Sequence, residues 1–341
     1  MKVGRFGRGI GGMTWFLLAA CGGTDNGSPA GAGASGAANQ AGSASEAGNG
    51  TSTAGAGGST SVAGSTGVAG SNHAGEGALD CSGAFGMPAE AMPRETGVAL
   101  GSPTLSPDGL ELIYARKPSG QIEFRRSLRT STSTSAAFPI GSPIPALDAA
   151  CQPGDDRSVD LSRDGLRAYV ACYAATGKPI GPATLHVAQR SAVGQDFTLL
   201  PGTSTVAPSA AISADELTLY TSSDVNPGLA PPRQYTRGAL ADAFGSAADI
   251  PGLETLNVSA PDPSPDGLSM YGGLNGEVVV STRPSVGMPF SAPVTLLAPA
   301  AALEQLGAPE LSHDCRSLYY LSQTSGTTTN MLTSVLLVVR R

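Results

Sequence analysis

The chain has 341 residues, of which 46 are Gly and 26 are Pro, and only 14% of its residues are charged. Its net charge is −7, so it lacks the excess of positive charge that favours nucleic-acid binding, and we expect no nucleic-acid partner.

Residues 1–20 read as an export signal. Three basic residues lie near the start, an apolar run follows at 15–18, and small residues precede Cys21. The run Leu18-Ala19-Ala20-Cys21 resembles a bacterial lipobox, in which the Cys is diacylated and becomes the first residue of the mature protein. The alternative is an ordinary signal peptide followed by an incidental Cys. We therefore predict a lipid anchor at Cys21 and a place in the bacterial cell envelope, at the outer membrane or cell surface rather than the inner membrane.

Residues 21–80 form a low-complexity tract of Gly, Ala, Ser, Thr and Asn without Phe, Tyr or Trp after Cys21. Such a segment buries too little apolar surface to offset its ordering entropy, so we predict a disordered tether. A flexible coil of this length spans roughly 40–45 Å. The folded part of the chain is expected at 81–341.

A repeated segment organises residues 81–341. It is first seen as PTLSPDGLELIY at 103–114, and it returns at 158–170, 208–221, 261–272 and 309–320. Its aspartates are 108, 164, 215, 266 and 314, which places the copies 48 to 56 residues apart. A period of this size, with strand-like text on both sides of a turn, is typical of a β-propeller.

The centre of each repeat is a turn. Ser106-Pro107-Asp108-Gly109 fits a type I turn at every position. Because Glu216 and Cys315 replace the Gly in two copies, we expect that the turn does not require a positive φ. The repeated Asp is interpreted as a turn residue that bonds nearby amides, with a metal-binding or catalytic carboxylate as the alternative.

Two further signals recur in register with the turn. Five residues after the Asp stands a Tyr in four copies and Ile113 in the first. Arg190, Arg237 and Arg283 each precede a Phe by seven residues, and this Phe opens a run that suits an outer strand because Pro is tolerated there. A repeat therefore reads as two strands joined by the turn, a third strand ending near Arg, and a fourth after Phe.

This pattern resembles the TolB-like, WD-type propeller repeats of bacterial envelope proteins, over about residues 85–341. The resemblance implies an all-β propeller. Residues 85–92 are expected to supply the outer strand of the last blade, beside the predicted strand at 332–339, which is too short to span a bilayer. This arrangement gives five blades. TolB-like propellers usually have six, so a blade hidden in the 116–158 interval is the alternative.

Four cysteines follow the anchor: 81, 151, 172 and 315. In an exported domain an even number predicts disulfides, with three possible pairings. Cys151 precedes the first strand of the second blade and Cys172 ends its second strand. Because these strands are antiparallel, this pairing is geometrically natural. Cys81 with Cys315 then follows by elimination.

The sequence contains no known cofactor-binding or catalytic motif, and neither His186 nor His313 has a His or Cys at metal-ligand spacing. Acids near the starts of the inner strands are the exception. They form a candidate binding mouth for a cation or a sugar, with solvated loop acids as the alternative: Asp148, Asp155, Asp156, Asp160 and Asp262.

We therefore predict a monomeric, lipid-anchored propeller that acts as a binding or scaffold module rather than an enzyme. Its partner would be an envelope protein, peptidoglycan or a glycan, by analogy with TolB-like proteins. The alternative is a carbohydrate-active hydrolase that uses carboxylates at the propeller mouth.

Overall fold

The structure is a computed structural model that describes residues 81, 83–118, 121–133, 136–153, 155–173, 183–206, 208–222, 231–325 and 332–341. The predicted signal peptide, the lipidation site Cys21 and the predicted tether at 21–80 lie outside these residues. Among the described residues, no helix has the length and apolar character needed to cross a membrane.

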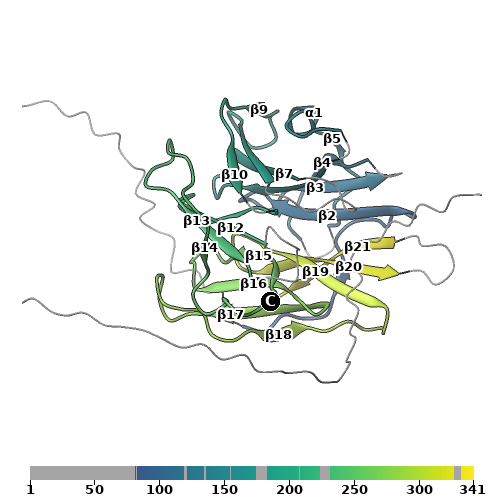
Figure 1. The fold of residues 1–341 in the computed structure, drawn as a ribbon. Helices are drawn as coiled ribbons and strands as arrows, with labels where there is room; N and C mark the ends of the chain where they lie inside the picture. Colours follow the sequence, from purple (N-terminus) through teal and green to yellow (C-terminus); the bar gives the residue numbers. More distant parts are fainter. Residues whose placement is uncertain are drawn as a thin grey trace, which may run out of the picture. The chain divides into compact units, whose positions relative to one another are not determined.

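The described residues form five antiparallel sheets arranged as a five-bladed β-propeller (Figure 1). Blade 1 contains β2 (Val98–Leu105), β3 (Glu111–Pro118), β4 (Glu123–Leu128) and β5 (Ser142–Pro143). Blade 2 contains β6 (Asp156–Leu161), β7 (Arg167–Tyr173), β8 (Ala183–Gln189), β9 (Thr198–Leu199) and β10 (Ser204–Val206). Blade 3 contains β11 (Ala211–Ile212), β12 (Thr218–Thr221), β13 (Arg233–Thr236) and β14 (Ala248–Asp249). Blade 4 contains β15 (Ser259–Pro263), β16 (Ser269–Leu274), β17 (Glu277–Thr282) and β18 (Val294–Leu297). Blade 5 contains β19 (Glu304–Leu311), β20 (Ser317–Ser325), β21 (Leu332–Arg340) and β1 (Ala89–Glu90).

The first strand of every blade lies at the centre of the ring. The contacts run from β2 to β6, β11, β15 and β19 and then back to β2. A hydrophobic cluster fills each interface between neighbouring blades, and the largest buried side chains in these clusters include Tyr169, Tyr271 and Tyr319. The repeated Tyr therefore packs between blades, as expected for strands sandwiched between neighbouring sheets.

The ring is closed by the amino-terminal segment. In β1, Ala89 pairs with Val338 and Glu90 with Leu337 of β21. The amides of Gly86 and Ala91 donate to β21 carbonyls on either side of this pair, at 2.7 and 2.9 Å. The predicted outer strand and the five-blade count are confirmed. The 116–158 interval contains no sixth blade in its described residues; it holds the end of blade 1 and a short helix, α1 (Pro145–Asp148).

The A–B turn, which joins the first two strands of a blade, is the same in all five blades. In blade 1, the Ser106 hydroxyl donates to Asp108 Oδ1 at 2.6 Å, and the same carboxylate accepts the Leu110 amide at 2.9 Å. This geometry supports a structural role for the repeated Asp. The expectation about φ was wrong: Glu216 and Cys315 adopt φ values of 59° and 60°, like the glycines of the other copies. The hydrogen-bonded turn therefore imposes a left-handed residue even where it is not Gly.

The repeated Arg and Phe form one contact in every blade. The guanidinium carbon lies 4.2–4.5 Å from the centroid of a Phe ring in the pairs Arg129–Phe138, Arg190–Phe197, Arg237–Phe244, Arg283–Phe290 and Arg341–Phe85. In blades 1 to 4 the Arg Nε also donates to the carbonyl of the fourth turn residue, at 2.7–2.9 Å. This Arg thus joins the A–B turn to the outer part of its blade.

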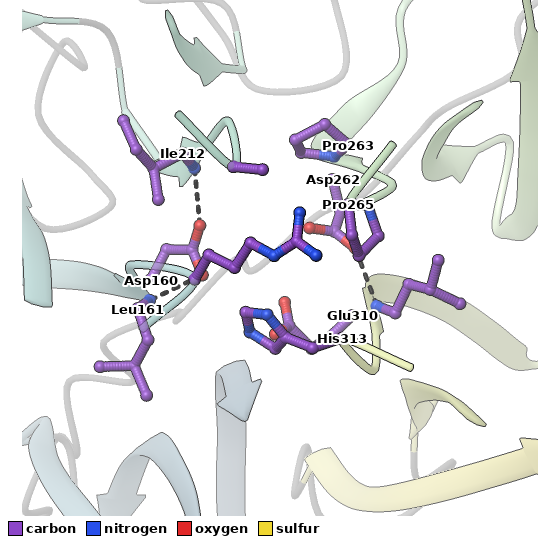
Figure 2. Close-up of a pocket in the computed structure, with 11 residues that line it drawn as sticks. Asp160, Leu161, Ile212, Asp262, Pro263, Pro265, Glu310 and His313 are labelled. Carbon is purple, nitrogen blue, oxygen red and sulfur yellow. Dashed lines mark hydrogen bonds between the residues drawn. The ribbon is translucent and has the colours of Figure 1, made fainter. Parts of the chain in front are cut away.

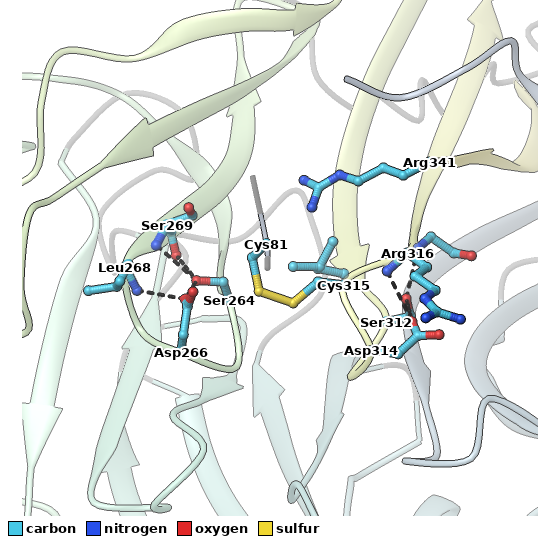
Figure 3. The surroundings of a disulfide bond; sticks show 12 residues. Cys81, Ser264, Asp266, Leu268, Ser269, Ser312, Asp314, Cys315, Arg316 and Arg341 are labelled. Carbon is cyan, nitrogen blue, oxygen red and sulfur yellow. Dashed lines mark hydrogen bonds between the residues drawn. A yellow bond between two sulfur atoms is a disulfide. The ribbon is translucent and has the colours of Figure 1, made fainter. Parts of the chain in front are cut away.

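Both predicted disulfides are present. Cys151 is bonded to Cys172 within blade 2, and Cys81 is bonded to Cys315 in the turn of blade 5 (Figure 3). The second bridge spans 234 residues and fixes the closing segment to the ring.

Candidate functional site

Polar side chains gather at the ring centre because every blade places one residue there at the same register. This position lies two residues before the turn Ser, and its occupants are Thr104, Asp160, Ala211, Asp262 and Glu310. In blades 1, 4 and 5 the pairing register shifts just before this position, and a residue with positive φ precedes it by two: Ser102, Ala260 and Ala308. A β-bulge of this kind re-aims the side chain that follows it.

Each polar side chain at this position accepts the backbone amide of the next blade. Thr104 Oγ1 accepts the Leu161 amide at 3.1 Å, and Asp160 Oδ2 accepts the Ile212 amide at 2.6 Å. Asp262 Oδ2 accepts the Leu311 amide at 2.9 Å. Glu310 Oε1 accepts the Leu105 amide at 3.2 Å, which completes the circle. We call these four contacts the inter-blade ties.

The junction between blades 3 and 4 has no tie, for a chemical reason visible in the sequence. Ala211 offers no side-chain acceptor, and the residue that would donate is Pro263, which has no amide hydrogen. A carboxylate at 211 would find no partner there. The exception therefore supports the view that the other four side chains are selected to satisfy buried amides.

Three of these carboxylates line a small cavity at the end of the channel nearest the A–B turns. In Figure 2, Asp160 lies on one side, with Asp262 and Glu310 on the other and His313 nearby. The cavity volume is about 30 Å³, which is enough for one or two water molecules and an order of magnitude below a typical ligand site. This cavity is therefore too small to hold a sugar ring.

Burial dominates the electrostatics of the cavity. It raises the pKa of Asp160 to about 6, against the hydrogen bonds that this carboxylate accepts. Burial also raises the pKa values of Asp262 and Glu310 well above their usual range, and the neighbouring carboxylates add to this effect. Burial and the positive charge of Arg163, which also lines the cavity, lower the pKa of His313. The cavity therefore favours neutral forms of its acids and of its histidine.

A second cavity, of about 560 Å³, lies between blades 1 and 2 at the ends of the blades opposite the A–B turns. It is lined by Pro118, Gln121, Ile122, Glu123, Asp148, Cys151, Pro153 and Arg157. We call it the blade 1–2 cavity. Burial raises the pKa of Asp148, and the charge of Glu123 adds to this, although the Phe124 amide and Arg157 oppose it.

The structure places three of the five predicted mouth acids in these two cavities and the other two outside them. Asp160 and Asp262 meet in the channel, whereas Asp148 lines the blade 1–2 cavity. Asp156 is buried and pairs with Lys117 at 3.1 Å, while Asp155 accepts the Gln152 amide within its own loop at 3.2 Å. The five acids therefore do not form one mouth, because strand β6 carries its acids toward opposite ends of the propeller.

Several residues of these sites were missed by the sequence analysis. Thr104 and Glu310 occupy the tie position of blades 1 and 5, and Arg163 and His313 follow the turn Ser directly. Their shared register with Asp160 and Asp262 was the available signal. Among the described residues, no group of three or more His, Cys, Asp or Glu side chains is arranged to hold a metal ion.

No protein-family model matches the chain, and no curated protein matches it in sequence. Solved structures with a similar fold include a GH43_1 enzyme from Xanthomonas citri, at 11% identity and a TM-score of 0.51, covering 73% of this chain and 90% of that one. RS223-β-xylosidase is similar at 9% identity and a TM-score of 0.51, over 74% and 94% of the two chains. At these identities the likeness shows a shared propeller fold alone.

TolB from Acinetobacter baumannii is also similar, at 14% identity and a TM-score of 0.39, over 70% of this chain. This chain spans about half of that protein, 54% of its length. The TolB structure therefore adds no functional argument.

Proposed function

We propose that this chain is a lipid-anchored binding protein of the bacterial cell envelope, attached through Cys21 and presenting the propeller as a ligand- or protein-binding module. One observation supports binding over catalysis. Each channel carboxylate accepts a backbone amide of the neighbouring blade, and the cavity that they enclose, about 30 Å³, has no room for a substrate. A cavity of about 560 Å³ lies instead between the blade ends, where propeller loops can meet a partner.

The anchoring part rests on the sequence Leu18-Ala19-Ala20-Cys21 and on two disulfides, which suit an exported protein. Changing Cys21→Ser should move the protein from the membrane fraction to a soluble envelope or secreted pool, because the acylated thiol is lost. Fractionation with and without a salt wash tests this prediction, and Ser28→Ala serves as a control outside the lipobox. A Cys21→Ser variant that stays membrane-bound after the wash would show that the anchor is wrong.

The alternative, a carbohydrate-active hydrolase, is favoured by the convergence of Asp160, Asp262 and Glu310 on one cavity. Glycosidases use carboxyl pairs of this kind, and two structures of similar fold are a GH43_1 enzyme and a β-xylosidase. Incubating the propeller with aryl β-xylosides and analysing the products by mass spectrometry separates the two functions. The binding proposal expects no products. Turnover that disappears in Glu310→Gln would establish the hydrolase instead.

A further inference from the structure

We infer that the blade 1–2 cavity binds a neutral, polyhydroxylated ligand, that is, a sugar unit of a glycan. This inference rests on the proposed binding function and deepens it by naming the ligand class and the site.

The cavity has the size and the mixed lining of a ligand site. Its volume of about 560 Å³ falls within the 300–1,000 Å³ typical of small-molecule sites. Pro118, Ile122 and Pro153 contribute apolar surface, and Gln121, Glu123 and Asp148 contribute polar groups. Apolar surface suits the C–H face of a sugar ring, while the polar groups match its hydroxyls.

The walls of the cavity are held in place before any ligand arrives. Leu147 of α1 is fully buried in the cluster between blades 1 and 2. Asp148 Oδ1 accepts the Phe124 amide at 2.8 Å, which fixes the end of α1 to β4. The Cys151–Cys172 bond fixes the following loop to β7. Preorganised walls reduce the ordering cost of binding.

Two carboxylates in the cavity each keep one oxygen unused. Asp148 Oδ1 accepts from Phe124 and from Arg157 Nη1, the latter at 2.9 Å. Glu123 Oε1 accepts from Arg116 at 2.8 Å and from Arg125 at 2.7 and 2.9 Å. Within the described residues the second oxygen of each carboxylate has no protein partner. Both side chains are 27% exposed, so a ligand hydroxyl can reach them.

Charge pairing selects against charged ligands. Asp148 is neutralised by Arg157, and Glu123 is neutralised by Arg116 and Arg125. An ammonium group would approach the Arg157 guanidinium and two carboxylates that already have Arg partners, and a carboxylate or phosphate would approach two acids. A hydroxyl both donates and accepts, so it can donate to the unused carboxylate oxygens and also accept from the Gln121 amide. A neutral sugar is therefore the ligand class that meets every polar group without an unpaired charge.

Titration calorimetry of the propeller with three trisaccharides tests the inference: neutral xylotriose, anionic trigalacturonate and cationic chitosan trimer. We expect xylotriose to bind at least tenfold more tightly than either charged trimer. Gln121→Ala removes an exposed amide, and Pro153→Trp fills the cavity from an exposed position, so neither disturbs the core. Each should weaken xylotriose binding at least tenfold. The matched controls are Gln195→Ala and Pro284→Trp, exposed residues in loops at the turn end of blades 2 and 4, which should bind like the wild type.

Three results would overturn the inference: no binding of xylotriose, preference for a charged trimer, or binding that persists in both cavity variants. Product analysis of the same samples separates its failure from failure of the proposed function. Bound xylotriose that is also cleaved would contradict the binding role and leave the site intact. If xylotriose does not bind but membrane attachment still depends on Cys21, the result would contradict the proposed ligand class and leave the proposed lipid anchor intact.

Discussion

Asp160, Asp262 and Glu310 are carboxyl groups whose burial raises their pKa values in the folded protein. A carboxyl group with a raised folded pKa contributes stability that is fully present below its unfolded pKa and is lost as the pH rises through the folded pKa. An unfolded Asp titrates near about 3.9. For Asp160 the loss therefore falls between about pH 4 and its folded pKa of about 6, and is on the order of 3 kcal/mol. Glu95, whose pKa is lowered mainly by its hydrogen bond from Arg116, acts in the opposite direction.

Because the raised pKa of Asp262 lowers stability as the pH rises, the variant Asp262→Asn provides a test. The Asn oxygen can still accept the Leu311 amide, but the side chain cannot ionise. The variant should match the wild type near pH 4 and exceed its unfolding free energy at pH 8 by about 0.5–3 kcal/mol, the usual range for one substitution. Urea unfolding from pH 4 to pH 8 measures the difference. Asp196→Asn, at a side chain that is 87% exposed, is the charge-matched control and should show no such crossover. A constant difference at every pH would contradict the prediction.

Two buried tyrosines offer a matched test of the bonds between blades. The Tyr169 hydroxyl donates to Glu216 Oε2 at 2.6 Å and accepts from Arg237 Nη2 at 2.7 Å. The Tyr319 hydroxyl, at the same register in blade 5, is buried without a hydrogen-bond partner in the described structure. Tyr169→Phe should therefore cost about 1–3 kcal/mol, because both charged partners lose a bond, whereas Tyr319→Phe should be nearly neutral. Equal losses of unfolding free energy in urea would contradict this assignment.

At the scale of the element, the first strand of each blade does two things at once. It pairs with its own sheet, and through the tie position it satisfies an amide of the next blade. Replacing Glu310 by Ala leaves the Leu105 amide buried without an acceptor, which should cost about 1–3 kcal/mol. Glu310→Gln keeps an acceptor oxygen and should cost much less. The two variants should be compared by urea unfolding at pH 5. At this pH the folded wild type keeps Glu310 neutral, because burial raises its pKa well above its usual range. Similar losses of unfolding free energy in both variants would show that Glu310 does not stabilise the fold by accepting the Leu105 amide.

The elements were predictable because the repeat occurs five times and most of its signals recur in four or five copies. The turn Ser and Asp, the Tyr register and the Arg–Phe pair are local patterns, and all of them recur in the structure. The ties were harder to find, because donor and acceptor lie 49 to 205 residues apart and one repeat does not contain both. Aligning the copies on the turn Ser would have grouped Glu310 with Asp160. The blade 1–2 cavity could not be foreseen, since its walls come from a connection that differs from every other copy.

The blade 1–2 connection also explains why Asp148, Asp155 and Asp156 looked like one cluster with Asp160. In sequence they are neighbours, but Asp156 begins the six-residue strand β6 and Asp160 lies four positions further on, near its end. In an extended strand each residue advances by about 3.3 Å, so acids close in sequence reach different ends of a blade. Proximity along a strand is therefore poor evidence for a shared site in a propeller.

At the scale of the whole molecule, the ring depends on a segment about 250 residues away in sequence from the strand that it meets. The entropy cost of joining such distant segments grows only logarithmically with length, so the closure is tolerable once five blades are nearly assembled. Several contacts offset that cost. Besides the β1–β21 pairs, Phe85 lies under the Arg341 guanidinium at 4.2 Å, Met92 is buried, and Cys81 is bonded to Cys315.

Deleting residues 82–94 should therefore expose the edge of β21 and open the ring. The deletion removes the β1–β21 pairs, the Phe85–Arg341 contact and the buried Met92. Losing a buried side chain of the size of Met92 alone costs about 2–5 kcal/mol, and each kcal/mol shifts the melting temperature by about 2–4 °C in a protein of this size. We expect the melting temperature to fall by at least about 10 °C, with aggregation visible by size-exclusion chromatography because an unpaired edge invites pairing between chains. Cys81→Ala with Cys315→Ala separates the bond from the strand and should lower the melting temperature by less. Deleting 30–70, within the predicted tether, should leave it unchanged. A monomeric protein that lacks 82–94 and melts like the wild type would refute this account of closure.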